Sequence, residues 1–300
     1  MKKDLSKAYI ALGLVSFLWG TTYIASKIGA QHMPGLFLSA LRQFSSGLIL
    51  TLFFLAKGYK LPDYCSMKRI SIQGFFLLCI ANGLLTWSLE YISGGLAAII
   101  AALVPLFIAL FSIWLLKYVK FTKWMIAGLI IGFGGVVVIF YDYLHYLADR
   151  SFAFGVVLAL LSTVSWAFGT VYASKKALAV DIMFNVGLQI LVAGIVLMVV
   201  CMVTGRYVNL ATAGNASLYS LIYLVFFGSL IAYSAYVFAV SKLPPTLVSV
   251  YAYINPVVAV LLGWLLLKEK MNPNMIMGTL ITLAGVYVVN REFKKQRTSR

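Results

Sequence analysis

The sequence predicts an all-α polytopic membrane protein, with ten transmembrane helices arranged as two inverted five-helix repeats around a central cavity. Three observations predict this fold: long apolar runs, basic residues gathered on one side of those runs, and an internal repeat. Hydrophobic residues make up 62% of the 300 residues and charged residues only 11%, whereas soluble domains have about 45–50% and about 25%. A soluble fold exposing this much apolar surface would aggregate, and disorder requires low hydrophobicity, so both classes are excluded.

The apolar runs are separated by charged or turn-forming breaks, and a membrane-spanning helix needs about 20 apolar residues. We therefore predict spans at residues 8–28, 36–56, 71–89, 95–116, 123–141, 152–173, 184–204, 218–240, 246–267 and 275–290. The first run follows Lys2, Lys3 and Lys7, as the core of a signal peptide would. It is longer than such a core and no convincing cleavage site follows it, so we interpret it as a retained helix.

The loop charges predict the orientation. Of the 24 Lys and Arg residues, 18 fall on one side of the predicted membrane and four on the other, while Lys27 and Arg42 lie within spans. The positive-inside rule assigns the richer side, and with it both termini, to the cytoplasm. The same rule explains the net charge of +16 without a nucleic-acid partner. The three cysteines form no CxxC motif and no His pair is present, so we expect no disulfide and no metal site.

The two halves of the chain resemble each other at an offset near 150 residues. The matched segments are Trp19 with Trp166, Tyr23-Ile24-Ala25-Ser26-Lys27 with Val171-Tyr172-Ala173-Ser174-Lys175, Val104-Pro105 with Asn255-Pro256, Trp114-Leu115-Leu116 with Trp264-Leu265-Leu266, Gly128 with Gly278, and Gly135-Val136 with Gly285-Val286. Their constant order indicates a duplication, with repeats at residues 1–145 and 146–300. Because five spans is an odd number, the second repeat is inverted, an arrangement common in transporters that alternate access to a site at the midplane.

Several motifs also carry a resemblance to a known family. They are Phe17-Leu18-Trp19-Gly20-Thr21, Arg42, Pro105, Ser165-Trp166-Ala167-Phe168-Gly169-Thr170, Ile254-Asn255-Pro256-Val257, Lys268-Glu269, Gly278 and Gly285-Val286. On these residues the whole chain resembles the EamA-like family of the drug/metabolite transporter superfamily. The resemblance implies a bacterial inner-membrane (plasma-membrane) efflux protein with ten helices and a central cavity. The family often has an acid after span 4 as well as span 9; Glu269 fits the second position, but Val119 occupies the first.

Arg42 lies inside the second predicted span, and its counterpart in the second repeat is Gln189. An arginine at the centre of a membrane helix costs about 2.5–3.5 kcal/mol on insertion scales. One interpretation places Arg42 at the mouth of the cavity, in contact with a substrate carboxylate, and includes Gln189 in the binding site. In the other, Arg42 extends outward to the membrane interface or pairs with Glu90.

Lys27 and Glu90 lie near the outer ends of spans 1 and 3. They could form an ion pair that closes an outer gate, or both could be solvated residues at helix ends. A proton-coupled carrier commonly uses a buried carboxylate or histidine as its relay. The sequence offers no clear relay, so facilitated transport and proton antiport both stay open.

Pro105 and Pro256 fall mid-span at equivalent positions of the repeats. Each removes a helical hydrogen bond, so both are candidate hinge or gate residues, with a simple packing kink as the alternative. Asn255, next to Pro256, and Asn82 in span 3 place amides near the midplane. These amides are candidate substrate contacts, or else partners in helix–helix hydrogen bonds.

Deep aromatic residues complete the candidate binding site. They are Trp19, Trp87, Trp166, Tyr233 and Tyr251, to which we add Thr22 on the first span. An aromatic-lined cavity suits amphipathic or aromatic solutes, whereas the alternative for each ring is ordinary packing. Trp124, at the start of a span, instead suits the aromatic belt at the membrane interface.

These features favour a transporter that exports small metabolites, such as amino acids or related amphipathic compounds, by alternating access. The alternative is a flippase or scramblase of a lipid-linked substrate, which would need a lateral opening between helices. An intramembrane enzyme would need a convergent nucleophile, base or metal cluster, so we expect no catalytic residue and no cofactor. The expected partners are a small-molecule metabolite and the lipid bilayer, and the chain is compatible with a monomer.

Overall fold

The computed structural model describes residues 2–116, 122–141, 146, 148–175, 178–243, 248, 251–269 and 272–298, and every regular element in these ranges is a helix. Seven helical segments are long and apolar enough to cross a membrane. They are Ser6–Gly29, Gly35–Ala56, Tyr64–Ser88, Gly94–Leu115, Arg150–Ser174, Ile182–Thr204 and Asn215–Lys242. Shorter apolar helices occupy Lys123–Gly135, Ile254–Leu267 and Pro273–Val289. The prediction of an all-helical membrane protein is confirmed over this part of the chain, whereas the count of ten spans stays a prediction.

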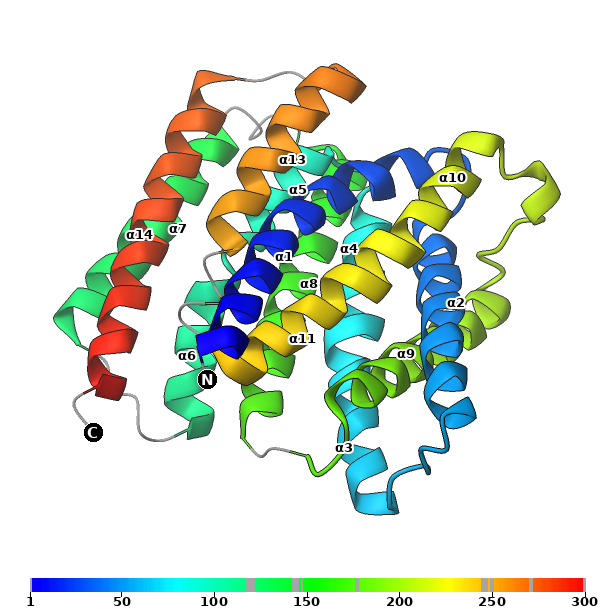
Figure 1. The fold of residues 1–300 in the computed structure, drawn as a ribbon. Helices are drawn as coiled ribbons and strands as arrows, with labels where there is room; N and C mark the ends of the chain where they lie inside the picture. The colour runs from blue at the N-terminus through cyan, green and yellow to red at the C-terminus, as the bar shows by residue number, and fades with distance from the viewer. Residues whose placement is uncertain are drawn as a thin grey trace.

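Figure 1 shows how the helices follow one another. The first half contains α1 (Lys2–Gly29), α2 (Gly35–Ala56), α3 (Tyr64–Gly74), η1 (Phe75–Asn82), α4 (Gly83–Ser88), α5 (Gly94–Ala101), α6 (Val104–Leu116) and α7 (Lys123–Tyr141). The second half contains α8 (Arg150–Ser174), α9 (Ile182–Thr204), η3 (Leu210–Thr212), α10 (Asn215–Tyr223), η4 (Leu224–Ile231), α11 (Ala232–Lys242), α13 (Tyr251–Leu267) and α14 (Pro273–Thr298). Val119, the start of the predicted span 246–267, and the predicted repeat boundary at residue 145 lie outside the described residues.

Short polar side chains mark where several helices begin. Asp63, Asp149 and Asp181 each accept hydrogen bonds from backbone N–H groups in the first turn of α3, α8 and α9. Such caps satisfy donors that have no partner within the helix. Hydrogen bonds from Ser66 hold the pKa of the Asp63 carboxyl below its usual value. At the other end of α9, Gly205 adopts a left-handed conformation with φ 66° that ends the helix.

The third predicted span of each half contains a π-helical segment, which the sequence did not predict. η1 lies between α3 and α4, and η4 lies between α10 and α11, at equivalent places in the two halves. The fourth span is also divided, because α5 ends at Ala101 and α6 begins at Val104. Pro105 lacks the N–H that would continue the helical hydrogen bonds across this break. Pro256, by contrast, lies inside the continuous helix α13.

Equivalent helices of the two halves pack against each other. α2 packs against α9, and α7 packs against α14, the latter pair standing side by side at the left of Figure 1. A Cβ atom on Gly47 would collide with the backbone of Leu191, and one on Gly194 with the backbone of Phe44. Because residue 44 lies beside 194 and residue 47 beside 191, α2 and α9 run antiparallel, and glycine allows their backbones to approach closely.

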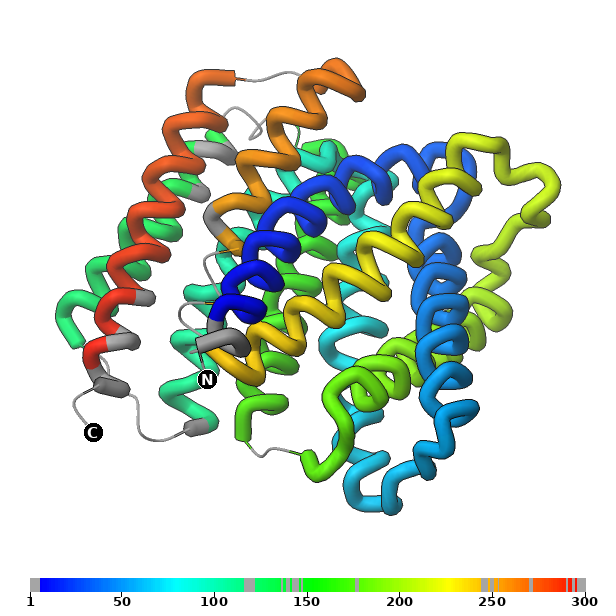
Figure 2. Tube along the Cα trace, viewed as in Figure 1, coloured from blue at the N-terminus to red at the C-terminus, as the bar shows by residue number. Residues whose placement is uncertain are grey.

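The remaining long helices surround the centre of the molecule. α1 packs against α13 and α11, and α8 packs against α6, η1 and α4. The buried cluster between them contains Trp19, Tyr233, Tyr236 and Tyr251. The tube in Figure 2 shows α1 and α11 crossing in front of this region, with α7 and α14 set to one side. Large apolar side chains on the outside, such as Trp124 with 67% of its surface exposed, fit a surface covered by lipid.

Candidate functional site

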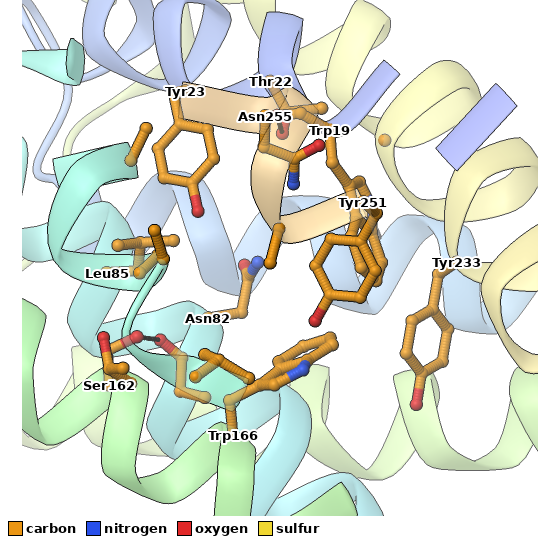
Figure 3. Close-up of a pocket in the computed structure, with 18 of the residues that line it drawn as sticks. Trp19, Thr22, Tyr23, Asn82, Leu85, Ser162, Trp166, Tyr233, Tyr251 and Asn255 are labelled. Carbon is orange, nitrogen blue, oxygen red and sulfur yellow. Dashed lines mark hydrogen bonds between the residues drawn. The ribbon is translucent and has the colours of Figure 1, made fainter. Parts of the chain in front are cut away.

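A cavity lies at the centre of the helices, and together with the open space at its mouth it has about 750 Å³ that is not filled by atoms. Its wall comes from both halves of the chain: α1, α2, η1, α4, α5 and the first residue of α6 from the first, and α8, η4, α11 and α13 from the second. Figure 3 shows Tyr23, Asn82, Trp166 and Tyr251 arranged around this common space. The cavity has the mixed apolar and polar lining typical of small-molecule sites.

The structure places eight of the ten residues predicted to bind substrate on the wall of this cavity. They are Trp19, Thr22, Arg42, Asn82, Trp166, Tyr233, Tyr251 and Asn255. Of the predicted gate or hinge residues, Pro256 also lines the cavity. Trp87, Gln189, Lys27, Glu90 and Pro105 are not among the lining residues, and the contacts of the first four, given below, place them elsewhere. Substrate contact by the lining residues stays a prediction.

Arg42 is buried, with only 6% of its surface exposed. Its Nε donates a hydrogen bond to Ser229 Oγ at 2.9 Å, and the guanidinium lies against Gly228, where an added Cβ would come within 2.8 Å of a terminal nitrogen. The side chain therefore turns inward to η4 and does not extend to the membrane interface. Among the described residues Glu90 pairs with Arg206 at 3.6 Å and not with Arg42.

Amide groups occupy two further places on the wall. Asn82 Oδ1 accepts hydrogen bonds from Ser39 Oγ at 3.1 Å and from Gln43 Nε2 at 2.9 Å, so α2 orients this amide. With its amide turned to satisfy its neighbours, Asn255 donates to the carbonyls of Tyr251 and Ser16. That second bond ties α13 to α1. Both amides thus hold helices together, as well as lining the cavity.

Aromatic rings from both halves form a continuous cluster along one part of the wall. The Trp19 ring lies 5.3 Å from that of Trp166, 4.9 Å from Tyr236 and 5.1 Å from Tyr251, measured between centroids. Tyr233 lies 6.4 Å from Trp166 and 6.2 Å from Tyr236. Edge-to-face and offset contacts at these separations are favourable. Four of these rings, those of Trp19, Trp166, Tyr233 and Tyr251, line the cavity and give it an aromatic surface.

Gln189 is engaged away from the cavity wall. Its Nε2 donates to Gln73 Oε1 at 2.8 Å and to Asn185 Oδ1 at 3.0 Å, and its Oε1 accepts from the Tyr233 hydroxyl at 2.6 Å. This network holds α9, α3 and α11 together and orients Tyr233, which does line the cavity. In this structure Gln189 therefore positions Tyr233, and substrate contact by Gln189 itself stays a prediction.

A second hollow of about 1150 Å³ lies at the turn between α1 and α2, lined in part by Lys27, Glu90 and Arg206. Of the two alternatives for Lys27 and Glu90, the ion pair is not formed between them in this structure. Lys27 Nζ donates to the carbonyls of Leu89 and Ile92, whereas Glu90 accepts from the Gly35 backbone N–H at 2.6 Å. Arg206 also stacks its guanidinium over the Trp87 ring at 4.3 Å. The Trp87 ring thus contacts Arg206, a residue that lines this hollow.

Glu269 spans from the end of α13 to the beginning of α5. Its two carboxylate oxygens accept hydrogen bonds from the backbone N–H groups of Gly94 at 2.9 Å and Gly95 at 3.2 Å. A carboxylate at a helix N-terminus satisfies free donors and interacts favourably with the helix dipole. Glu269 therefore joins the two halves on the same side of the molecule as Lys27.

Sequence reasoning missed three polar residues of this region, namely Tyr23, Ser229 and Tyr236. Tyr236 follows Tyr233 by three residues and so shares its helix face, a signal that was present in the sequence. Ser229 interrupts an apolar run, but its role depends on η4, which no sequence pattern predicted. Tyr23 stands next to Thr22 and lines the cavity.

Comparisons with known proteins agree with this architecture. The model of the EamA-like transporter family matches residues 6–141 and again residues 153–291. The uncharacterized inner membrane transporter YedA of Escherichia coli (strain K12) is 34% identical over 262 residues, covering 87% of this chain and 83% of its own. The uncharacterized transporter YvbV of Bacillus subtilis (strain 168) is 28% identical over 99% of this chain and 96% of its own.

Protein PecM of Dickeya dadantii (strain 3937) is 28% identical, over 91% of this chain and 88% of its own. A solved crystal structure also aligns with the chain, with a TM-score of 0.68 over 94% of this chain and 96% of the other. At 19% identity that likeness shows the fold alone.

Proposed function

The chain belongs to the EamA-like transporter family, and from this premise we propose that it is an inner-membrane carrier that exports small metabolites by alternating access. The observation that carries the proposal is the central cavity, whose wall is built from both halves of the chain. A site shared between two halves can be exposed to either side of the membrane when one half moves against the other. The proposed solutes are amphipathic, amino acids or related compounds, because the wall combines a cation, amides and an aromatic cluster. Such a site calls for no catalytic residue and no cofactor.

The proposal includes ten spans in two inverted repeats, residues 1–145 and 146–300. Three observations support it: the family model matches the chain twice, η1 and η4 occur at equivalent places, and α2 packs antiparallel to α9. A two-fold axis in the membrane plane makes equivalent helices antiparallel where they meet. Such pairs are what an inverted repeat requires.

The proposed orientation places both termini in the cytoplasm. α1 begins and α14 ends toward the same, lower side of Figure 1, which supports an even number of crossings. The excess of basic residues in the loops on that side supports a cytoplasmic location. We propose that the chain acts as a monomer, since the cavity is complete within one chain.

Counterflow in proteoliposomes tests the proposal. Vesicles containing the purified protein are loaded with one unlabelled small solute at a time and then diluted into a trace of the same labelled solute. The proposal predicts transient, saturable accumulation of at least one small amphipathic solute, which protein-free vesicles lack. If a labelled lipid crosses the bilayer instead while every small solute fails, the chain is a flippase or scramblase. If neither moves, the carrier proposal is wrong.

A further inference from the structure

The cavity contains a buried positive charge without a counter-charge. In the part of the chain that the structure describes, Arg42 makes one side-chain hydrogen bond, from Nε to Ser229 Oγ, and no carboxylate lies within ion-pair distance. The residues that line the cavity include no Asp and no Glu. A charge removed from water without a partner is costly, and a bound anion would remove that cost.

The described residues around Arg42 leave the two terminal nitrogens of its guanidinium free to bind a ligand. Ser229 occupies only the Nε position. Gly228 leaves the space in which the guanidinium lies, since a Cβ there would come within 2.8 Å of Nη2 and 3.2 Å of Cζ. Neither terminal nitrogen donates a hydrogen bond to any described residue. The paired terminal N–H groups of a guanidinium match the two oxygens of a carboxylate, in a geometry that a lysine does not offer.

The rest of the wall is uncharged. Trp19, Trp166 and Tyr251 present aromatic rings, and Asn82 and Asn255 present amides. Aromatic faces suit the apolar body of a solute. An ammonium group would find no carboxylate in this wall, and it would add a second positive charge close to Arg42.

We propose that the cavity selects organic monoanions: a carboxylate bound by Arg42, with an apolar or aromatic body against the Trp19–Trp166–Tyr251 surface. The inference rests on the proposed carrier function and narrows it. Among solutes of one shape, the monoanion binds more tightly than the zwitterion, and the cation binds least. Amphipathic carboxylates are therefore better substrates than the corresponding amino acids.

Four probes with the same phenylethyl frame test this selectivity. They are 3-phenylpropionate, phenylalanine, 3-phenylpropanamide and phenethylamine, which carry a negative, a zwitterionic, a neutral and a positive head group. Binding to the full-length protein in detergent is followed by tryptophan fluorescence and by the thermal unfolding midpoint. We expect the carboxylate to bind at least tenfold more tightly than the amide, phenylalanine to lie between them, and the amine to bind most weakly.

Two variants connect the selectivity to Arg42. Arg42→Gln should weaken binding of the carboxylate about 10–100-fold, as expected for the loss of charge-assisted hydrogen bonds, and should weaken binding of the amide by much less. Because the amide still reports on the cavity, its retained binding shows that the variant is folded. Arg42→Lys keeps the positive charge but loses the paired N–H groups of the guanidinium. It should therefore retain part of the preference for the carboxylate over the amide.

The proposal is overturned if the amide or the amine binds as well as the carboxylate, if Arg42→Gln leaves the preference intact, or if the carboxylate fails to bind at millimolar concentration. These outcomes are separate from those of the counterflow experiment. A carrier that moves cations or neutral solutes would keep the proposed function and lose this inference, whereas selective binding without transport would do the reverse.

Discussion

The indole rings of Trp19 and Trp166 meet edge to face, with centroids 5.3 Å apart and planes at 88°, although the two residues come from opposite halves of the chain. Both line the central cavity, and Tyr236 touches both rings. These aromatic contacts between the two halves therefore lie at the cavity itself. Any movement of one half against the other must change this contact, so the pair is placed to respond to a solute.

The first prediction concerns this pair. Trp19→Ala and Trp166→Ala should each weaken binding of a cavity solute by about 1–3 kcal/mol, because each removes ring surface that would cover the solute. Trp19→Phe should lose less binding affinity, because it keeps an aromatic ring. It also serves as a control for a folding defect in Trp19→Ala, which removes more of the side chain. The control is Trp124→Ala, since that side chain is 67% exposed. Fluorescence titration with 3-phenylpropionate measures all four. A signal that persists in both cavity variants but disappears in the Trp124 variant would place the solute elsewhere.

Many residues of the cavity wall could be predicted from the sequence, because polar residues are rare inside a membrane span and so stand out. Arg42, Asn82 and Asn255 are costly inside a bilayer, so their presence alone marked them, and the structure places all three on one wall. Trp19 and Trp166 were paired by the internal repeat. The repeat also predicted Gln189 in the site; its side chain bonds to Gln73, Asn185 and Tyr233, and its contact with a substrate stays a prediction.

The partners of these residues were harder to predict. Arg42 contacts Ser229 because η4 changes the helical phase of its span, and π-helical segments leave no simple periodic pattern. Glu90 pairs with Arg206, which lies beyond a long predicted span in the other half. Long-range contacts of this kind depend on how the helices pack. The charges in the loops indicate only on which side of the membrane a loop lies, and not which residue it contacts.

The second prediction concerns the close approach of α2 and α9. Gly47→Ala should destabilise the protein by about 1–3 kcal/mol, because the new methyl group would collide with the backbone of Ile190 and Leu191. Gly13→Ala is the matched control: nothing lies within 4 Å of its added Cβ, so the same exchange should be neutral or slightly stabilising. Thermal unfolding in one detergent compares the two. Equal midpoints would contradict the packing of these helices.

The third prediction concerns Glu269. Glu269→Ala should lower the free energy of unfolding by about 0.5–2 kcal/mol, because the N–H groups of Gly94 and Gly95 lose their acceptor. Glu269→Gln keeps one acceptor oxygen and should lose less. Glu292→Gln serves as the control, since its contact with Lys295 is a long pair of 3.9 Å of a kind that contributes little. If the Ala variant matches the control in thermal unfolding, Glu269 does not hold α5 in place.

The fourth prediction concerns topology. Cys65 is exposed, whereas Cys79 and Cys201 are buried, so Cys65 should dominate the labelling of the unmodified protein. In intact spheroplasts a membrane-impermeant thiol reagent should leave Cys65 unlabelled and should label a cysteine introduced at Ser151. Inside-out vesicles should give the opposite pattern. The reversed result in both preparations would invert the proposed orientation.

The most direct test of the central claim, alternating access to the cavity, uses a single cysteine on the cavity wall. Ala101 lines the cavity and is partly exposed, so Ala101→Cys is introduced into a chain whose three native cysteines are replaced. An impermeant thiol reagent is then applied to right-side-out and inside-out vesicles, with and without a transported solute. The account predicts labelling from each side in turn, and protection by the solute from both. Labelling from one side only, whatever solute gradient is imposed, would contradict it.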